Sequence, residues 1–436
     1  MYFLYSLLAA TALLASAPWV AWQAVRHGKY RHRWPERFGS LPAGLIGTAA
    51  PTLWLHAVSV GEVLSAVPLV AAIRRDHPEW RVVVSTTTRT GRDMADARLS
   101  GAAGVFYFPL DFAWIVRRVL RHLRPSVLLI VETEIWPNLV RLCRADGIGV
   151  LLVNARISDR SYPRYRLAGR LLATVLGQFD RLCAQSEGTA DRLRALGAPP
   201  ERVIVTGSLK YDVASEAPRS VADVAARLEG VPVLLAASTL KGEDEIVLDA
   251  FEQLRAGSPD ALLVLAPRHP ERFDAVAALA ARPTLRMIRR TALAANQNAP
   301  FDVLVLDTIG ELAAICAQAT VVFVGGSLVP AGGHNILEPA RFGRPIVVGP
   351  SMSNFAEMAR NFLDAGAMVQ VEDAAGAQRE LLALFADPSR RQRLGDAARA
   401  VLERHRGAVG RTMREVAEVM RTRSGARQPT GAGVGR

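Results

Sequence analysis

The chain has 436 residues, more than one hydrophobic core usually serves, so two domains are expected. Half of the residues are hydrophobic and 22% are charged, a balance that excludes a wholly disordered chain. Three cysteines offer neither a disulfide framework nor a metal cluster, and they suit a reducing compartment. The net charge of +12 indicates an anionic partner. Nucleic acid is not favoured, because zinc-finger spacing and a basic helix with interleaved aromatics are both missing.

The N-terminal segment predicts membrane attachment. No residue from Tyr2 to Trp22 is charged, and such a stretch is about as long as a bilayer core requires. Five lysines and arginines follow at once, and the positive-inside rule places everything after Arg26 on the cytoplasmic side. Residues 1–25 are therefore predicted to be an anchor that spans the bilayer or inserts deeply. An interfacial helix interrupted at Pro18 is the alternative, whereas a cleaved signal peptide would need positive charge before the apolar run.

The rest of the chain alternates short apolar runs with helical patterns, which is typical of parallel sheets covered on both faces. Two such series, separated by a polar stretch near 211–230, predict two doubly wound, Rossmann-like α/β domains over 26–215 and 216–421. A helix from its N-cap Ser389 to Arg421 and a disordered tail over 422–436 complete the chain. The predicted strands are Thr52–Ala57, Arg81–Thr86, Val105–Phe108, Val127–Val131, Gly149–Val153, Arg181–Ala184, Val203–Thr206, Val233–Ala237, Ala261–Ala266, Leu285–Ile288, Val303–Leu306, Val321–Val324, Pro345–Val348 and Met368–Val371.

Open parallel sheets bind ligands beyond the carboxyl ends of their strands, and the first candidate motif, His56–Glu62, overlaps such an end. Glu62 stands at the start of a helix predicted over Val63–Asp76. The helix dipole there favours an ionised carboxylate, as a general base requires. The alternative is that the carboxylate only caps the helix.

The second motif, Glu132–Asn138, follows another apolar strand and combines two glutamates with a tryptophan and a proline. Its glutamates either act chemically or cap the next helix. No third metal ligand and no D-x-D triplet accompany them, so a metal site is not predicted.

The third motif, Gly207–Lys210, closes the last strand of the first half. Lys210 is placed to neutralise a departing phosphate or an acidic sugar, unless it is a solvated linker residue.

Four strings in the second half also lie at strand ends: Pro267–Pro270, Ile309–Leu312, Gly325–Ser327 and Gly332–Pro339. The arginine of the first suits a phosphate. The glycine pairs of the last two are expected to let a phosphate approach backbone N–H groups. A glutamate near the end of the last string is placed to bind ribose hydroxyls. Taken singly, each string also fits an ordinary strand-to-helix turn.

In this order the strings resemble those of the bacterial 3-deoxy-D-manno-octulosonic acid (Kdo) transferases, from about Arg26 to about Arg406. Asn154–Arg156 and Ser238–Glu243 strengthen the resemblance. It implies a GT-B fold, in which two Rossmann-like domains face each other across a cleft. It also implies an inverting transfer of Kdo from CMP-Kdo to a lipid A precursor, lipid IVA, at the cytoplasmic face of the inner membrane. Neither a catalytic metal nor another cofactor is implied.

The resemblance also assigns residues. Glu62 is implied as the general base, and Glu132 and Lys210 as groups that stabilise the transition state. The residues implied to hold CMP are Pro267, Arg268, Ile309, Gly310, Glu311, Asn335, Ile336, Leu337 and Glu338. Alternatives are a membrane-bound transferase or sugar epimerase of the same fold that uses a UDP-sugar, and a nucleotide-binding module without catalysis. The motifs His56–Glu62 and Glu132–Asn138 argue against an enzyme that uses a UDP-sugar. A nucleotide-binding module without catalysis would not need Glu62.

Overall fold

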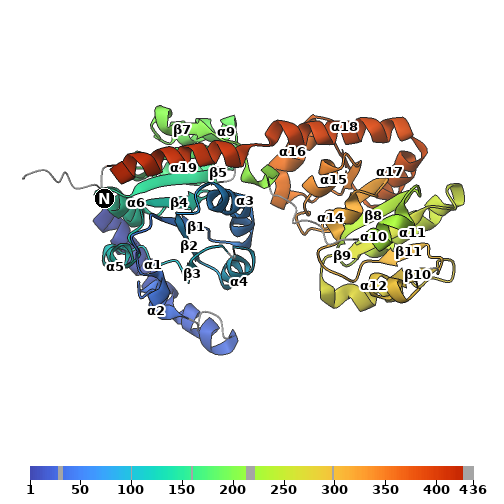
Figure 1. Cartoon of the computed structure of the whole chain (residues 1–436), viewed down its shortest axis with the longest axis horizontal. Helices are drawn as coiled ribbons and strands as arrows, with labels where there is room; N and C mark the ends of the chain where they lie inside the picture. The colour runs from blue at the N-terminus through green and yellow to red at the C-terminus, as the bar shows by residue number, and fades with distance from the viewer. Residues whose placement is uncertain (28–32, 100, 159–160, 213–220, 297–298, 426–436) are drawn as a thin grey trace, which may run out of the picture. The chain divides into compact units, whose positions relative to one another are not determined.

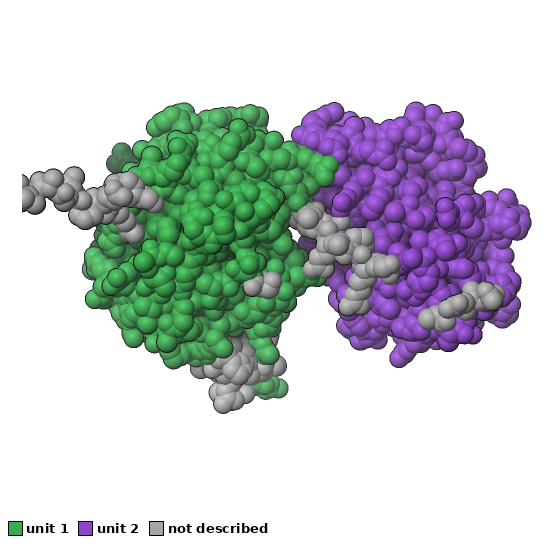
Figure 2. Space-filling model, in the orientation of Figure 1, with its two compact units in different colours: residues 1–214, 406–436 green, residues 215–405 purple. Residues whose placement is uncertain are grey.

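The computed structural model describes residues 1–27, 33–99, 101–158, 161–212, 221–296 and 299–425. The chain divides into two compact units (Figure 2). Unit 1 comprises Met1–Ala214 with Arg406–Arg436, and unit 2 comprises Ser215–His405. The chain therefore returns to its first unit after completing the second.

Unit 1 is built on seven parallel strands in the order β3-β2-β1-β4-β5-β6-β7. The chain winds outward from β1 to β3, then resumes at β4 on the other side, so the topological switch point lies between β1 and β4. The predicted strands are confirmed, with ends displaced by two residues at most. They are β1 (Thr52–His56), β2 (Arg81–Thr86), β3 (Gly104–Tyr107), β4 (Val127–Val131), β5 (Gly149–Ala155), β6 (Arg181–Ala184) and β7 (Val203–Val205).

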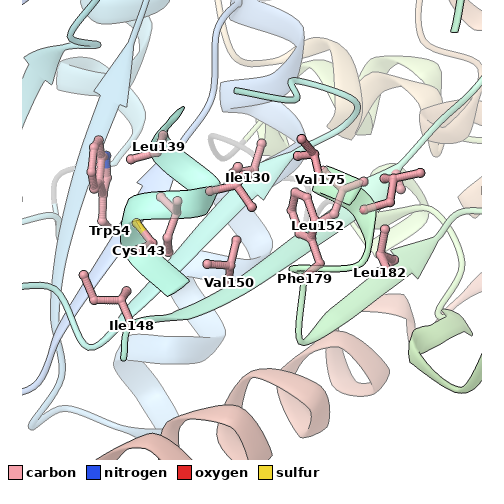
Figure 3. Close-up of a cluster of buried hydrophobic side chains, with 14 of the residues drawn as sticks. Trp54, Ile130, Leu139, Cys143, Ile148, Val150, Leu152, Val175, Phe179 and Leu182 are labelled. Carbon is pink, nitrogen blue, oxygen red and sulfur yellow. The ribbon is translucent and has the colours of Figure 1, made fainter. Parts of the chain in front are cut away.

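Helices cover both faces of this sheet, because successive side chains of a strand point to opposite faces. Trp54 of β1 belongs with Cys143 and Phe179 to the hydrophobic core on one face (Figure 3), and Leu53 belongs with Met413 to the core on the other. The helices of unit 1 are α1 (Tyr2–His27), α2 (Trp34–Arg37), α3 (Val60–Asp76), α4 (Arg89–Arg98), α5 (Ala113–Leu123), α6 (Pro137–Ala145), α7 (Tyr162–Leu167), α8 (Gly169–Leu176), α9 (Glu187–Ala195) and α19 (Ala408–Gly425), with short 3-10 turns η1 (Ala43–Leu45), η2 (Pro200–Arg202) and η3 (Leu209–Asp212).

Unit 2 repeats the plan with seven parallel strands in the order β10-β11-β9-β8-β12-β13-β14. Its switch point lies between β8 and β12. The strands are β8 (Val233–Thr239), β9 (Leu262–Pro267), β10 (Met287–Arg289), β11 (Val303–Val305), β12 (Val321–Val324), β13 (Ile346–Val348) and β14 (Val369–Gln370). The helices are α10 (Ala222–Leu228), α11 (Glu243–Gly257), α12 (Phe273–Ala280), α13 (Arg290–Leu293), α14 (Leu312–Cys316), α15 (Leu337–Arg341), α16 (Ala356–Asp364), α17 (Ala374–Ala386) and α18 (Pro388–His405), with 3-10 turns η4 (Pro270–Arg272), η5 (Ala294–Asn296) and η6 (Ser353–Phe355). Two doubly wound parallel sheets confirm the predicted pair of Rossmann-like domains.

The C-terminal helices differ from the prediction. The single helix predicted from Ser389 is two helices, α18 and α19, separated where Gly407 adopts a positive φ of 84°. Asp387, rather than Ser389, accepts the first-turn hydrogen bond from the backbone N–H of Arg390. Helix α19 packs against the sheet of unit 1, beside β5 and α3 (Figure 1), so assigning 406–421 to the second domain is wrong.

The two ends of the chain complete the description of unit 1. The predicted tail begins too early, because α19 continues to Gly425, and residues 426–436 lie outside the described residues. At the other end, residues 2–27 form the helix α1, whose Ser6 hydroxyl accepts a 3.0 Å hydrogen bond from the Asn138 amide. Within the described part of the chain, we find no helix with the length and apolar character needed to cross a membrane.

Candidate active site

The carboxyl ends of β1 and β4 bring the first two motifs together. These strands are hydrogen-bonded neighbours on either side of the switch point of unit 1. The first motif runs from the end of β1 into α3, and the second runs from the end of β4 into α6. Ligands of open α/β sheets bind at this location, because the chain departs in opposite directions on its two sides.

Glu62 occupies the first turn of α3, which begins at Val60 and therefore three residues earlier than predicted. Ser59 is the N-cap, and its hydroxyl accepts from the Glu62 N–H at 3.4 Å. The Glu62 carboxylate in turn accepts from the Ser59 hydroxyl at 2.9 Å and from the Val58 N–H at 2.7 Å. This reciprocal arrangement is a variant of the capping box, and it fixes the carboxylate in one orientation.

Burial changes the protonation of this carboxylate. Glu62 is only 8% exposed, and desolvation raises its pKa from 4.5 to about 7. The hydrogen bonds from Val58 and Ser59 oppose the rise, and the negative charges of Glu132 and Glu134 add to it. Burial therefore outweighs the helix dipole, and about half of the Glu62 carboxylates are ionised at pH 7, rather than nearly all of them as the helix dipole alone would give. A carboxylate whose pKa lies near neutral pH is instead well matched to accept and release a proton.

Glu132 and Lys210 form an ion pair beyond the carboxyl ends of β4 and β7. The Lys210 ammonium lies 3.3 Å from the Glu132 carboxylate, and both side chains are about one-quarter exposed (26% and 23%). Glu132 has a positive φ of 59°, a conformation that a non-glycine residue seldom adopts outside a constrained site. Two groups distant in sequence, both singled out by the resemblance, are thus joined in one ion pair.

Asn154 is a supporting residue to which the sequence assigned no role. It is buried at the end of β5, has a positive φ of 55°, and accepts a 3.0 Å hydrogen bond from the Leu209 N–H. This contact fixes the backbone next to Lys210. The signal was present in the sequence, since Asn154 is a polar residue closing the apolar run Gly149–Val153.

An aromatic stack lies beneath these motifs. The ring of His56 stacks on Phe108 at 3.9 Å between centroids, and Trp136 lies 4.8 Å from Phe108. Burial lowers the pKa of His56 to about 3, so its imidazole is neutral near pH 7. His56 therefore supports the motif by packing, and Glu62 is the group of this motif that titrates near neutral pH.

In unit 2, the ends of β8, β9 and β12 gather part of the predicted nucleotide site. Arg268 follows Pro267 at the end of β9, and its N–H donates to the Thr239 carbonyl at 3.0 Å. Its positive charge lowers the pKa of Glu338, which burial raises overall, so the two groups interact. The Asn335 amide donates to Glu338 at 3.3 Å. The exposed Arg268 and the largely buried Glu338 therefore lie near each other. An arginine of this kind suits a phosphate, and a carboxylate suits ribose hydroxyls.

Several other residues predicted to bind CMP are paired within the protein or buried. The Glu311 carboxylate is paired with Arg290 at 2.8 Å, while Ile309 is exposed and Gly310 turns the chain with φ 94°. Ile336 is fully buried and Leu337 is 8% exposed, so neither side chain is open to a ligand.

The glycine loop after β12 is not the free phosphate cradle that its sequence predicts. The N–H groups of Gly326, Ser327 and Leu328 all donate to the carboxylate of Glu243. The helix α15 that follows the second glycine pair has five residues, so its dipole is small. The prediction that the loop Gly325–Ser327 offers free N–H groups to a phosphate is wrong.

Comparison with known proteins identifies the family to which the chain belongs. Residues 32–213 match the family model described as 3-Deoxy-D-manno-octulosonic-acid transferase (kdotransferase). The 3-deoxy-D-manno-octulosonic acid transferase of Bordetella pertussis is 38% identical over 92% of this chain and 95% of its own length. The chain belongs to the 3-deoxy-D-manno-octulosonic acid transferase family.

Two solved structures resemble this Kdo transferase family member. The C-terminal CMP-Kdo binding domain of WaaA from Acinetobacter baumannii is 35% identical and covers 42% of this chain and 100% of its own, with a TM-score of 0.39. The UDP-GlcNAc 2-epimerase of Neisseria meningitidis, bound to UDP-GlcNAc, covers 84% of this chain and all of its own, with a TM-score of 0.57. At 14% identity, the epimerase shares the fold alone. Among the described residues of this family member, no three histidine, cysteine or acidic side chains are grouped to hold a metal ion.

Proposed function

We propose that the protein is a glycosyltransferase that moves Kdo from CMP-Kdo to the sugar hydroxyl of a lipid A precursor in lipopolysaccharide biosynthesis. Membership of the Kdo transferase family supports the reaction. The observation that carries the proposal is the buried Glu62, with a pKa of about 7, beside the Glu132–Lys210 pair at the switch point of unit 1.

Glu62 is proposed as the general base. Its carboxylate takes the proton of the acceptor hydroxyl as that oxygen forms a bond to the anomeric carbon of Kdo. The bond from that carbon to the phosphate oxygen breaks, and CMP leaves as an anion. Because one oxygen replaces another in a single displacement, the anomeric configuration inverts. The hydrogen bonds from Val58 and Ser59 keep the carboxylate aimed in one direction during this step.

The charged groups are proposed to stabilise the separating charges. Kdo carries a carboxylate beside its anomeric carbon, so the reaction centre combines an oxocarbenium-like cation with a fixed negative charge. The Lys210 ammonium complements that carboxylate, while Glu132 complements the developing positive charge. In unit 2, Arg268 binds the phosphate of CMP, and Glu338 binds its ribose hydroxyls. This division assigns the acceptor chemistry to unit 1 and the nucleotide contacts to unit 2.

We also propose that α1 attaches the protein to the cytoplasmic face of the inner membrane. Its first turns are tied to unit 1: the Ser6 hydroxyl accepts from Asn138, and the Arg141 guanidinium lies 4.6 Å from the Tyr2 ring. Another part of the helix surface is apolar and exposed. The large exposed apolar residues of α1 are Phe3, Leu4, Leu7, Leu8, Leu14 and Trp22. A helix held on one side and apolar on the other suits insertion into a membrane surface, where a lipid acceptor resides.

Donor choice tests the proposed activity against other enzymes of this fold. Purified protein is incubated with a lipid A precursor and either CMP-Kdo or UDP-N-acetylglucosamine, and the lipid is analysed by mass spectrometry. We expect an added Kdo with the first donor and unchanged lipid with the second. Transfer of N-acetylglucosamine, or epimerisation of the UDP-sugar, would overturn the proposed function.

A further inference from the structure

Glu243 fills the space that a phosphate was expected to occupy. It is the first residue of α11 and is fully buried, close to the switch point of unit 2. One carboxylate oxygen accepts from the N–H groups of Leu240 and Gly326, at 2.8 and 2.7 Å. The other accepts from Ser327 and Leu328, both at 3.0 Å. Four backbone donors therefore converge on one side chain.

This arrangement is an anion-binding nest occupied by the protein's own carboxylate. Neither lysine nor arginine forms an ion pair with Glu243 within the described ranges, so the backbone supplies its stabilisation. Leu240 belongs to the loop after β8, and the other three donors belong to the loop after β12. Because β8 and β12 are neighbours at the switch point, Glu243 ties the two loops that flank it.

Both of these loops lead to the nucleotide contacts. On the β8 side, the Thr239 carbonyl accepts from the Arg268 N–H at 3.0 Å. On the β12 side, the Gly326 carbonyl accepts from the Gly333 N–H at 2.7 Å, two residues before Asn335. The packing leaves no slack, since a Cβ on Gly325 would lie 2.6 Å from the Ser238 carbonyl and 2.8 Å from the Glu243 carboxylate.

We propose that Glu243 is a positioning residue of the donor site. It sets the places of Arg268 and of the segment Asn335–Glu338 by holding the loops before them, and it directs the phosphate of the donor to Arg268 by occupying the N–H nest. The inference rests on the proposed function, in that unit 2 binds a cytidine nucleotide.

Replacing Glu243 by glutamine tests this role. An amide keeps one acceptor oxygen but places an NH2 group against two backbone N–H donors, so the loops must separate. We expect the KM for CMP-Kdo and the calorimetric Kd for CMP to rise about tenfold or more, with kcat changed less than about threefold. Asp249→Asn is the matched control, because Asp249 is a half-exposed residue of the same helix, paired with Arg282. It should leave KM and kcat unchanged.

A purely structural residue would lower the thermal unfolding temperature without this KM effect. An unchanged Kd for CMP in folded Glu243→Gln overturns the positioning role, and a tighter Kd overturns the exclusion of phosphate from the nest. If Glu243→Gln does not fold, Gly325→Ala perturbs the same contact. A similar rise in KM supports the inference, and an unchanged KM refutes it. A wild-type protein that binds no CMP instead refutes the proposed function, which separates the two failures.

Discussion

Glutamine at position 62 offers a sharp test of the proposed base. The capping arrangement at the start of α3 accepts Glu or Gln at this position. In Glu62→Gln the amide oxygen still accepts from the Val58 N–H, its NH2 group donates to the Ser59 hydroxyl instead of accepting from it, and the basic carboxylate is removed. A positioned general base contributes about 10²- to 10⁴-fold to a rate. We therefore expect kcat to fall by at least about 100-fold, with the Kd for CMP unchanged.

The pKa of Glu62 gives the expected pH dependence. With a pKa of about 7 the carboxylate is ionised in about one-tenth of the molecules at pH 6 and about nine-tenths at pH 8. Only the ionised form accepts a proton, so the wild-type rate should rise about tenfold between these values. The residual rate of Glu62→Gln should lack this rise.

The same pKa predicts a stability difference of known sign. Glu62 has a folded pKa of about 7 and an ordinary value of 4.5. Its contribution to the free energy of unfolding is therefore fully present below pH 4.5 and is lost as pH rises through 7. The shift corresponds to about 3 kcal/mol at most. Glutamine does not titrate, so the free energy of unfolding of Glu62→Gln, relative to wild type, should rise by up to about that amount between pH 4.5 and pH 8.

Initial rates of Kdo transfer from pH 6 to pH 8 measure the first effect, and urea unfolding curves from pH 4.5 to pH 8 measure the second. Glu79→Gln is the control, because that glutamate is 58% exposed. A Glu62→Gln protein that keeps the wild-type rate and pH profile would refute the assigned base. A lost rate accompanied by lower stability at pH 8 would instead indicate a structural role.

Three further outcomes follow from the site and from α1. Lys210→Met should lower kcat about 100-fold or more by removing the cation, whereas the exposed Lys241→Met should not; equal rates would contradict the role of Lys210. Arg268→Gln should weaken CMP binding about tenfold or more in calorimetry, whereas Arg289→Gln should leave it unchanged; equal affinities would remove Arg268 from the site. Leu7→Ser should weaken binding to anionic vesicles about tenfold in flotation, because one exposed apolar side chain is lost; unchanged flotation would contradict insertion of α1.

The sequence predicted the sheets well because their signal is local. Runs such as Val127–Val131 are apolar throughout and rich in β-branched residues, as buried parallel strands require. The motifs at strand ends followed from the same reasoning, since adjacent parallel strands end at one edge. The resemblance named Glu132 and Lys210 together, but their ion pair was not predicted and is a contact that the structure adds.

The features that the sequence did not reveal depend on long-range packing. The ionisation of Glu62 follows from how deeply it is buried, which no local pattern states. The glycine loop after β12 looked empty because its partner, Glu243, lies over 80 residues earlier in the chain. Helix α19 carries an apolar face that fits either domain, and only its contacts with the sheet of unit 1 assign it. In each case the sequence motif was recognisable, but the residues that pack against it in the fold could not be read from the sequence.

The anomeric configuration of the product tests most directly whether an acceptor hydroxyl activated by Glu62 displaces CMP in one step. The linkage formed from CMP-Kdo and a lipid A precursor is determined by NMR on purified product. The proposed mechanism requires a configuration opposite to that of the donor. A product with the donor's configuration would require two successive displacements or attack from the face that CMP leaves, and either would contradict the role assigned to Glu62.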